Sequence, residues 1–463
     1  VLPAGYLFGT VAALTVAVAV HGLLQYSGLT LSANNFKMTG TFDNPAGFAA
    51  ALACALPYVF GFFRNPRRAV VYVSVIIAFV ILLAAVLSGS RAAIFASLVA
   101  IVCYAGSKYS GIKWKRWLKI SLICIAVAGT TALYFLKKDS ADGRLLIWQN
   151  TLNMVLDKPV AGHGYGAFNE KYMTYQAEYF EAHPDSKYSL LADNVLHPFN
   201  EYLLVVSEHG VVGLGILVLL GLFVVRSYLR KPDRTKFIAL LSLLSLAVFS
   251  CFSYPFKYPF TWVIVFLNIA ALCPAEKMFS SNIYSMAFRT GTAVFAAGLL
   301  FAGITLMKAE IRWNTVAKQS LAGKTAEMLP EYDRLYKELN KNGLFLYNHA
   351  AELHEVGEYE RSLSVFERCI KHYNDYDVQM LIADNYNNLK QYDKAEYHLK
   401  RASAMCPVRF MPLYRLVELY RATNRMNEAI VLAQQILDKK VKIPSPTVSA
   451  IKNKMKQLIN EQQ

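Results

Sequence analysis

Apolar runs of about twenty residues follow one another through the first two thirds of the chain. Each run is long enough to cross a hydrocarbon core of roughly 30 Å as a helix. The pattern predicts a polytopic membrane domain over residues 1–307, with about nine spans and a long outer loop at 137–198. The predicted spans lie near residues 5–25, 46–63, 69–88, 92–107, 118–136, 200–225, 236–253, 259–275 and 287–307.

After residue 307 the pattern changes to short amphipathic periods with no spanning run. Aligning residues 357–362 with 390–395 and 424–429 gives steps of 33 and 34 residues, which is the tetratricopeptide period. Each copy has a polar turn, then an aromatic or apolar residue, then a small residue where two helices must approach closely. We therefore expect a helical connector or cap at 308–350 and a tetratricopeptide-like solenoid at 351–463, giving an all-α protein.

Composition and charge support the same division. The chain is 55% hydrophobic and 17% charged, which excludes a purely soluble or disordered protein. Of the 24 Lys and Arg in residues 1–307, 15 fall in four alternate loops, at 64–68, 108–119, 226–236 and 277–289. By the positive-inside rule these loops are cytoplasmic, so the outer loop and the repeats lie on the opposite side. The net charge of +16 is therefore mostly a topology signal, and we expect no nucleic-acid partner.

The sequence starts at Val1, and an apolar run begins almost at once without a basic leader. We therefore expect that an N-terminal part, with earlier spans, is missing. No pair of the seven cysteines has metal or redox spacing. Because no metal-ligand cluster, nucleophile motif or nucleotide-binding loop is visible in the sequence either, we expect neither a metal nor a cofactor.

Two arginines at the outer membrane face are candidates for anion binding. Arg91 lies in the tight outer turn at 88–91 between two predicted spans, and Arg144 lies at the start of an amphipathic stretch within the outer loop. Facing one cavity, they would form a planar, permanently charged clamp suited to a diphosphate. Two plainer interpretations stay open: Arg91 as an interfacial anchor, and Arg144 as the local ion-pair partner of Asp142.

His197 precedes a spanning helix that begins at the outer side. Its neutral form is available near pH 7, so it could act as a base toward an acceptor hydroxyl, or serve as an interfacial hydrogen-bonding group. Asn200 and Glu201 lie near the start of that helix, where they can satisfy free amides or orient a neighbour. Gly210 and Gly213 further along predict close packing against another helix.

Together these elements resemble the O-antigen ligase and polymerase superfamily of bacterial envelope glycosyltransferases, over roughly residues 38–225. Asn200, nine intervening residues, Gly210 and Gly213 reproduce the spacing of the ligase signature. The usual signature has a histidine immediately before the asparagine, but here Phe199 stands there and His197 lies two residues earlier. The other matching pieces are residues 40–45, 87–91, Gly143 and Arg144 with Trp148, and 157–166.

The resemblance implies transfer of an oligosaccharide from an undecaprenyl diphosphate carrier to an acceptor at the periplasmic face of the bacterial inner membrane. It implies catalysis by His197, Arg91 and Arg144, with Arg91, Arg144 and Asn200 binding substrate, and no metal. The acceptor is left open among the lipid A core of ligases, a second glycan of polymerases and the Ser/Thr hydroxyls of protein O-oligosaccharyltransferases. The repeats could recruit a protein acceptor or an assembly partner, or act only as a spacer.

Two other classes of function are possible alternatives. A non-catalytic, membrane-anchored repeat scaffold would depend on residues 351–437 and not on the arginines. A transporter or flippase would favour charges at mid-membrane or broken helices in paired halves. The sequence has no strong pattern of either kind, apart from His21 in the first span and Glu208 with His209 in the sixth.

Overall fold

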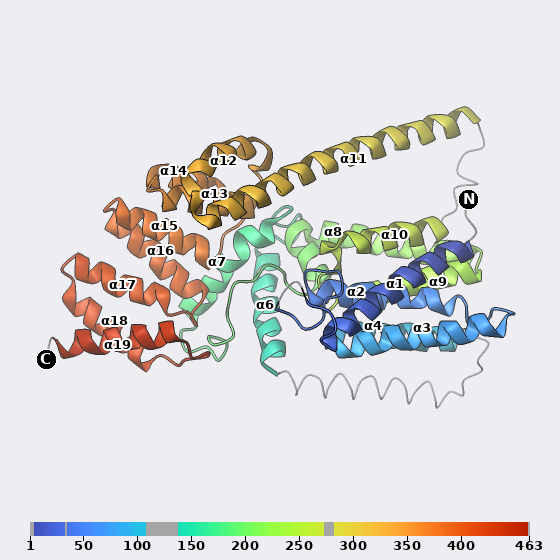
Figure 1. The fold of residues 1–463 in the computed structure, drawn as a ribbon, viewed down its shortest axis with the longest axis horizontal. Coiled ribbons are helices and arrows are strands. Elements are labelled where there is room, and N and C mark those ends of the chain that lie inside the picture. Colours follow the sequence, from blue (N-terminus) through green and yellow to red (C-terminus); the bar gives the residue numbers. More distant parts are fainter. Residues whose placement is uncertain (1–3, 33–34, 108–137, 273–281, 462–463) are drawn as a thin grey trace. The chain divides into compact units, whose positions relative to one another are not determined.

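The computed structural model describes residues 4–32, 35–107, 138–272 and 282–461 (Figure 1). Within these ranges the regular structure is helical and there is no β-strand, as the sequence predicts. The chain divides into two compact units, Val1–Ala141 with His197–Phe279 and Asp142–Leu196 with Ser280–Gln463. The three domains expected from the sequence, at 1–307, 308–350 and 351–463, stay a prediction.

The helices of the first unit begin and end within a few residues of the predicted spans. α1, α3 and α8 have the length and hydropathy needed to cross a membrane, as does the apolar part of α11 in the second unit, while α2, α4 and α10 are shorter apolar helices. The predicted span at 118–136 lies outside the described residues. The helices are α1 (Ala4–Tyr26), α2 (Pro45–Phe60), α3 (Arg68–Leu87), α4 (Arg91–Gly106), α8 (Glu201–Arg230), α9 (Arg234–Ser250) and α10 (Pro259–Leu272).

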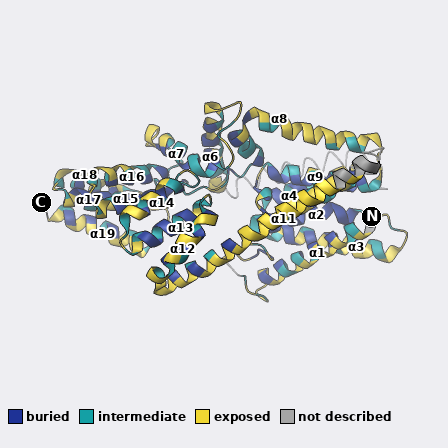
Figure 2. Cartoon of the chain, turned by 90° about the horizontal axis from the view of Figure 1, so that it is seen from above, coloured by how far each residue is buried: buried dark blue, intermediate teal, exposed yellow. Residues whose placement is uncertain are grey.

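Helix α2 forms the centre of the first unit, and its side chains from Gly47 to Phe60 are all buried (Figure 2). α1, α3, α4, α9 and α10 pack around it. A chain of buried hydrogen bonds joins three of these helices: Ser242 Oγ donates to the Cys54 carbonyl at 2.7 Å, Asn268 Nδ2 donates to Ser242 Oγ at 2.9 Å, and the Tyr58 hydroxyl donates to Asn268 Oδ1 at 2.8 Å. These bonds satisfy polar groups where an unpaired one would be costly.

Helix α8 bends at Gly210, whose backbone is non-helical with φ 61° and ψ −162°. Only glycine adopts this conformation readily. A Cβ added to Gly213 would lie 2.4 Å from the Cβ of His209, one turn earlier in the same helix. Gly210 therefore permits a bend in α8, and the close packing of another helix against the two glycines stays a prediction.

The second unit contains helices from the outer loop as well as from the C-terminal part. They are α6 (Lys138–Asp157, which belongs to this unit from Asp142 onward), α7 (Ala167–Ala182), α11 (Asn282–Gln319), α12 (Thr325–Leu339), α13 (Gly343–Glu355), α14 (Tyr359–Cys369), α15 (Tyr376–Asn388), α16 (Tyr392–Met405), α17 (Met411–Ala422), α18 (Met426–Asp438) and α19 (Pro446–Asn460).

Helices α13 to α18 form successive pairs, with α14, α16 and α18 as the second members (Figure 1). These second helices begin at Tyr359, Tyr392 and Met426, which are 33 and 34 residues apart. The small residues that the sequence places after each polar turn, Ser362, Ala395 and Ala429, are all 0% exposed. Assignment of the pairs to the tetratricopeptide class stays a prediction.

The outer-loop helix α7 packs against α16 through buried polar contacts. Gln176 is 0% exposed, and its Nε2 donates to the carbonyls of Met405 at 2.7 Å and Asp193 at 3.1 Å. Further along, Asn194 Nδ2 donates to a carboxylate oxygen of Asp375 and to one of Asp377, both at 2.9 Å. Much of the predicted outer loop is thus an integral part of the C-terminal helical unit.

Helix α11 is continuous over 38 residues. Its apolar side chains from Val294 to Met307 are largely exposed, as Figure 2 shows by the yellow ribbon. Only a few residues later Ala309 is 0% exposed in the core of the second unit, and Trp313 Nε1 donates to Asn348 Oδ1 at 2.7 Å. The same unbroken helix therefore belongs first to an apolar surface and then to a packed core.

Candidate functional site

His197 lies in the segment that leads into α8, packed against an aromatic side chain. Its ring stacks on the ring of Tyr254, with centroids 4.4 Å apart and planes at 24°. Burial, followed by the nearby positive charge of Lys257, lowers the pKa of His197 to about 4. The imidazole is therefore neutral at physiological pH and can accept a hydrogen bond, although a base with so low a pKa binds a proton weakly.

Asn200 caps helix α8, as the sequence predicted. Its Oδ1 accepts hydrogen bonds from the backbone N–H groups of Tyr202 at 3.0 Å and Leu203 at 3.1 Å. The carbonyl oxygen is thus used by the helix, and the amide N–H groups are what Asn200 has to offer a ligand. Just before it, Phe199 has a φ of 53°, a left-handed conformation that is unusual for an aromatic residue. The backbone therefore turns sharply where the usual ligase signature has its histidine.

Glu201, the first residue of α8, holds the turn on which Tyr254 lies. The Glu201 side chain is 8% exposed, and its Oε1 accepts the backbone N–H of Phe256 at 3.1 Å. Phe256 belongs to the short 3₁₀ helix Pro255–Lys257, which directly follows Tyr254. Orientation of a neighbour by Glu201 was predicted from its position at the helix start. The neighbour itself was missed, because nothing in the local pattern of residues 254–258 pairs them with residues 197–201.

Arg91 is the first residue of α4 and lies immediately after the N-cap, Ser90. Its Nη2 donates to Ser140 Oγ at 3.2 Å. A cation at this end of a helix opposes the positive end of the helix dipole, so it does not stabilise α4 electrostatically. The same arrangement adds the dipole to the guanidinium charge and creates a positive potential that attracts an anion.

Arg144 lies on α6, a helix whose Leu146, Ile147 and Asn150 are buried. Ser140, the partner of Arg91, precedes Arg144 by four residues in the same helix, so these two residues share a helix face. Arg91, His197 and Asn200 belong to the first unit and Arg144 to the second. Convergence of the two arginines on one ligand stays a prediction.

No metal site was found in the described residues: no group of three or more His, Cys, Asp or Glu there is placed to hold a metal ion. The expectation of a metal-independent reaction is still a prediction, because it concerns the chemistry and not only the described side chains.

Comparison with known proteins gives two matches, both to part of the chain. A family model described as O-antigen ligase matches residues 76–218, about a third of the chain. All four residues predicted for the site, Arg91, Arg144, His197 and Asn200, lie inside this stretch. A protein of Rickettsia typhi named "Putative polysaccharide ligase" is 32% identical over 120 residues, which cover 26% of this chain and 26% of that protein.

The helices and the matches agree on a coarse assignment. Several apolar helices are long enough to cross a membrane, and the matched stretch runs from α3 into α8. These findings support a multi-pass membrane protein in which residues 76–218 are similar to O-antigen ligases.

Proposed function

We propose that the protein transfers a glycan from an undecaprenyl diphosphate carrier to an acceptor hydroxyl at the periplasmic face of the bacterial inner membrane. The observation that carries the proposal is the O-antigen ligase match at residues 76–218, which contains Arg91 at the start of a helix and the His197 segment. The alternating basic loops support an orientation with the outer loop and the C-terminal helices in the periplasm.

Arg91 and Arg144 bind the diphosphate in this proposal. In an inverting displacement the acceptor oxygen attacks the anomeric carbon, and the bond from that carbon to the diphosphate oxygen breaks with its electron pair on the oxygen. Negative charge therefore grows on the leaving diphosphate. Guanidinium groups are permanently charged and offer several donors in one plane, so they stabilise this charge without a metal.

His197 accepts the proton of the acceptor hydroxyl, and the N–H groups of Asn200 orient the substrate. A neutral imidazole is available for this because the pKa of His197 is about 4. The hydroxyl becomes far more acidic as its bond to the anomeric carbon forms. A weak base can therefore still remove the proton late in the reaction.

The acceptor could be the lipid A core, a second glycan or a protein hydroxyl, which correspond to ligase, polymerase and protein O-oligosaccharyltransferase activities. A tetratricopeptide-like solenoid that recruits a partner protein is consistent with the helix pairs and their spacing of 33 and 34 residues.

Transfer by full-length protein in proteoliposomes tests the proposal. The donor is a fluorescent undecaprenyl diphosphate glycan, each acceptor class is supplied in turn, and mass spectrometry identifies the product. Arg91→Gln and Arg144→Gln should each lower the rate about 100-fold, the usual effect of removing one donor to a developing negative charge. Arg68→Gln is the matched control, since Arg68 is the first residue of α3 and precedes a predicted span from the cytoplasmic side. Normal transfer by both arginine variants would overturn the assignment of the arginines to the diphosphate. No transfer by the wild type to any acceptor, with the carrier bound and intact, would favour the non-catalytic scaffold.

A further inference from the structure

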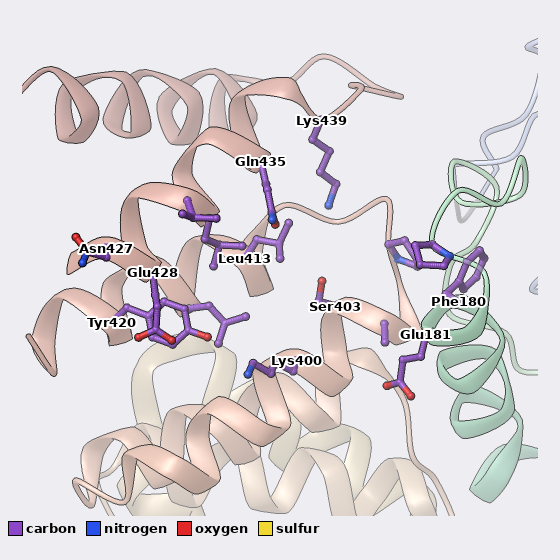
Figure 3. A pocket seen from close by; sticks show the side chains of 16 residues that line it. Phe180, Glu181, Lys400, Ser403, Leu413, Tyr420, Asn427, Glu428, Gln435 and Lys439 are labelled. Carbon is purple, nitrogen blue, oxygen red and sulfur yellow. The ribbon is translucent and has the colours of Figure 1, made fainter. Parts of the chain in front are cut away.

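A cavity of about 740 Å³ lies in the second unit, between the end of α7 and helices α16, α17 and α18 (Figure 3). Its walls are mostly apolar and include Phe180, Leu413, Leu416 and Val431. Val431 is 60% exposed, so apolar surface remains accessible to a ligand from solvent. The cavity is formed largely by the second helices of consecutive pairs and by a segment of the predicted outer loop.

The α7 wall of this cavity is fixed to the helix pairs. Arg401 of α16 contacts Glu178 through Nη2 and Glu181 through Nη1, each at 3.4 Å. Together with the buried amide of Gln176, these contacts hold the end of α7 beside α16. The cavity therefore has walls that exist before any ligand binds, which lowers the entropy cost of binding.

The charged groups around the cavity are largely neutralised by one another. Glu181 pairs with Arg401, and Lys400 Nζ lies 2.7 Å from a carboxylate oxygen of Glu396. Glu428 pairs with Arg425. Because these side chains are already paired, most of the wall has little electrostatic attraction for a charged ligand.

Lys439 is the exception among the described cavity residues, because no carboxylate pairs with it there. Its Nζ donates to the carbonyl of Arg409 at 2.6 Å and lies 4.8 Å from the centroid of the Phe410 ring. Burial lowers the pKa of Lys439 to about 8, so the ammonium is still mostly charged at pH 7. In Figure 3 its side chain extends toward the cavity. A partly desolvated cation without a counter-ion favours an anionic ligand.

The remaining polar groups of the cavity are suited to a polypeptide. The side chains of Ser403, Asn427 and Gln435 line the cavity and form no hydrogen bond to any described residue. Two amides and a hydroxyl can pair with the N–H and C=O groups of an extended chain, while the apolar wall accepts its side chains. An acyl chain would leave these groups unpaired, and a neutral sugar would not provide a counter-ion for Lys439.

We propose that this cavity binds a segment of a partner protein that has an internal acidic residue flanked by apolar residues. The acidic side chain pairs with Lys439, and the flanking apolar side chains contact Leu413, Leu416 and Val431. Because the walls belong to both α7 and the helix pairs, the bound segment contacts the outer-loop part and the repeat part of the unit together. This site is independent of the proposed glycosyl transfer.

Peptide binding to the full-length protein in nanodiscs tests the proposal. The probe is an array of fluorescent, acetylated and amidated decapeptides in which one aspartate is flanked by leucine, valine or proline. Each peptide has a twin with asparagine in place of aspartate, and a second set has no acidic residue but a free C-terminal carboxylate. Fluorescence polarisation gives the dissociation constants for the wild type, Lys439→Met and the control Lys440→Met, which changes an exposed neighbouring lysine.

At least one aspartate peptide should bind the wild type about tenfold more tightly than its asparagine twin, as expected for one charge-assisted pair. Lys439→Met should abolish this difference, while Lys440→Met should preserve it. Since Lys439 is packed against Phe410, Val431→Glu at the exposed rim provides a second variant that is expected to fold, and it should weaken the same peptide by repulsion. The proposal is overturned if no aspartate peptide binds better than its twin, if the difference survives in Lys439→Met, or if only free carboxylates bind.

Discussion

The attachment of the outer-loop helix α7 to the C-terminal helices can be broken at a single buried amide. Gln176→Met keeps an unbranched side chain of similar volume but removes every hydrogen bond of the amide. The carbonyls of Asp193 and Met405 lose their donor, and the Tyr172 hydroxyl loses an acceptor at 2.9 Å. A buried polar group without a partner costs about 1–3 kcal/mol. Allowing for partial relaxation of these three groups, we expect a local loss of about 3 kcal/mol.

Hydrogen exchange measured by mass spectrometry on the full-length protein reads out this loss directly. A change of about 3 kcal/mol in the opening free energy corresponds to roughly 100-fold faster exchange in peptides from residues 167–196. Gln149→Met, at an exposed position of α6, should leave the exchange of these peptides unchanged. The reasoning is refuted if Gln176→Met exchanges in residues 167–196 at the wild-type rate, because the buried amide would then contribute nothing to the attachment.

Three further changes test packing, ionisation and the helix pairs. Gly47→Ala places its Cβ within 2.8 Å of the Tyr258 ring, so it should lower the free energy of unfolding by about 1–3 kcal/mol and with it the unfolding temperature. Gly215→Ala, which has open space around it, should leave the unfolding temperature unchanged. Equal unfolding temperatures for the two variants would contradict the close packing at Gly47. The pKa of His197 is lowered from 6.5 to about 4, so the imidazole stays neutral as the pH falls through 6.5. The wild-type transfer rate should therefore stay level in that range and decline only near pH 4. A decline centred at pH 6.5 would count against the buried, neutral imidazole. Ser362→Ala removes two buried hydrogen bonds and should lower the free energy of unfolding of the second unit by about 1–3 kcal/mol, as measured by denaturant unfolding. An unchanged denaturant midpoint would show that these bonds do not stabilise the unit.

The membrane helices could be predicted closely because each span is a continuous run of apolar residues. The information is local, and so is the start of α4, where Ser90 caps the helix and Arg91 begins it. The spacing of the second helices in the C-terminal pairs could also be predicted, because each has a small residue at the same place after a polar turn. Ser362, Ala395 and Ala429 are buried, as expected for small residues at positions where two helices approach closely.

Contacts between distant segments could not be predicted from the same signals. His197 stacks on Tyr254, and Gln176 bonds to Met405, yet neither local pattern points to its partner. An isolated glutamine in an amphipathic helix is usually exposed, so its complete burial in α7 has no local signal. The bend at Gly210 could not be predicted either, because spaced glycines in an apolar helix are equally compatible with close packing of another helix.

Helix α11 joins an exposed apolar segment to the packed core of the second unit. With 38 residues it is about 57 Å long at 1.5 Å per residue, and it has no break between its exposed apolar part and the buried Ala309. A change of 10° in its tilt moves one end relative to the other by about 10 Å over that length. Tilt is the usual response of a span to bilayer thickness. In a bilayer, a change in thickness that alters the tilt of α11 would therefore displace the helices that pack on its far end.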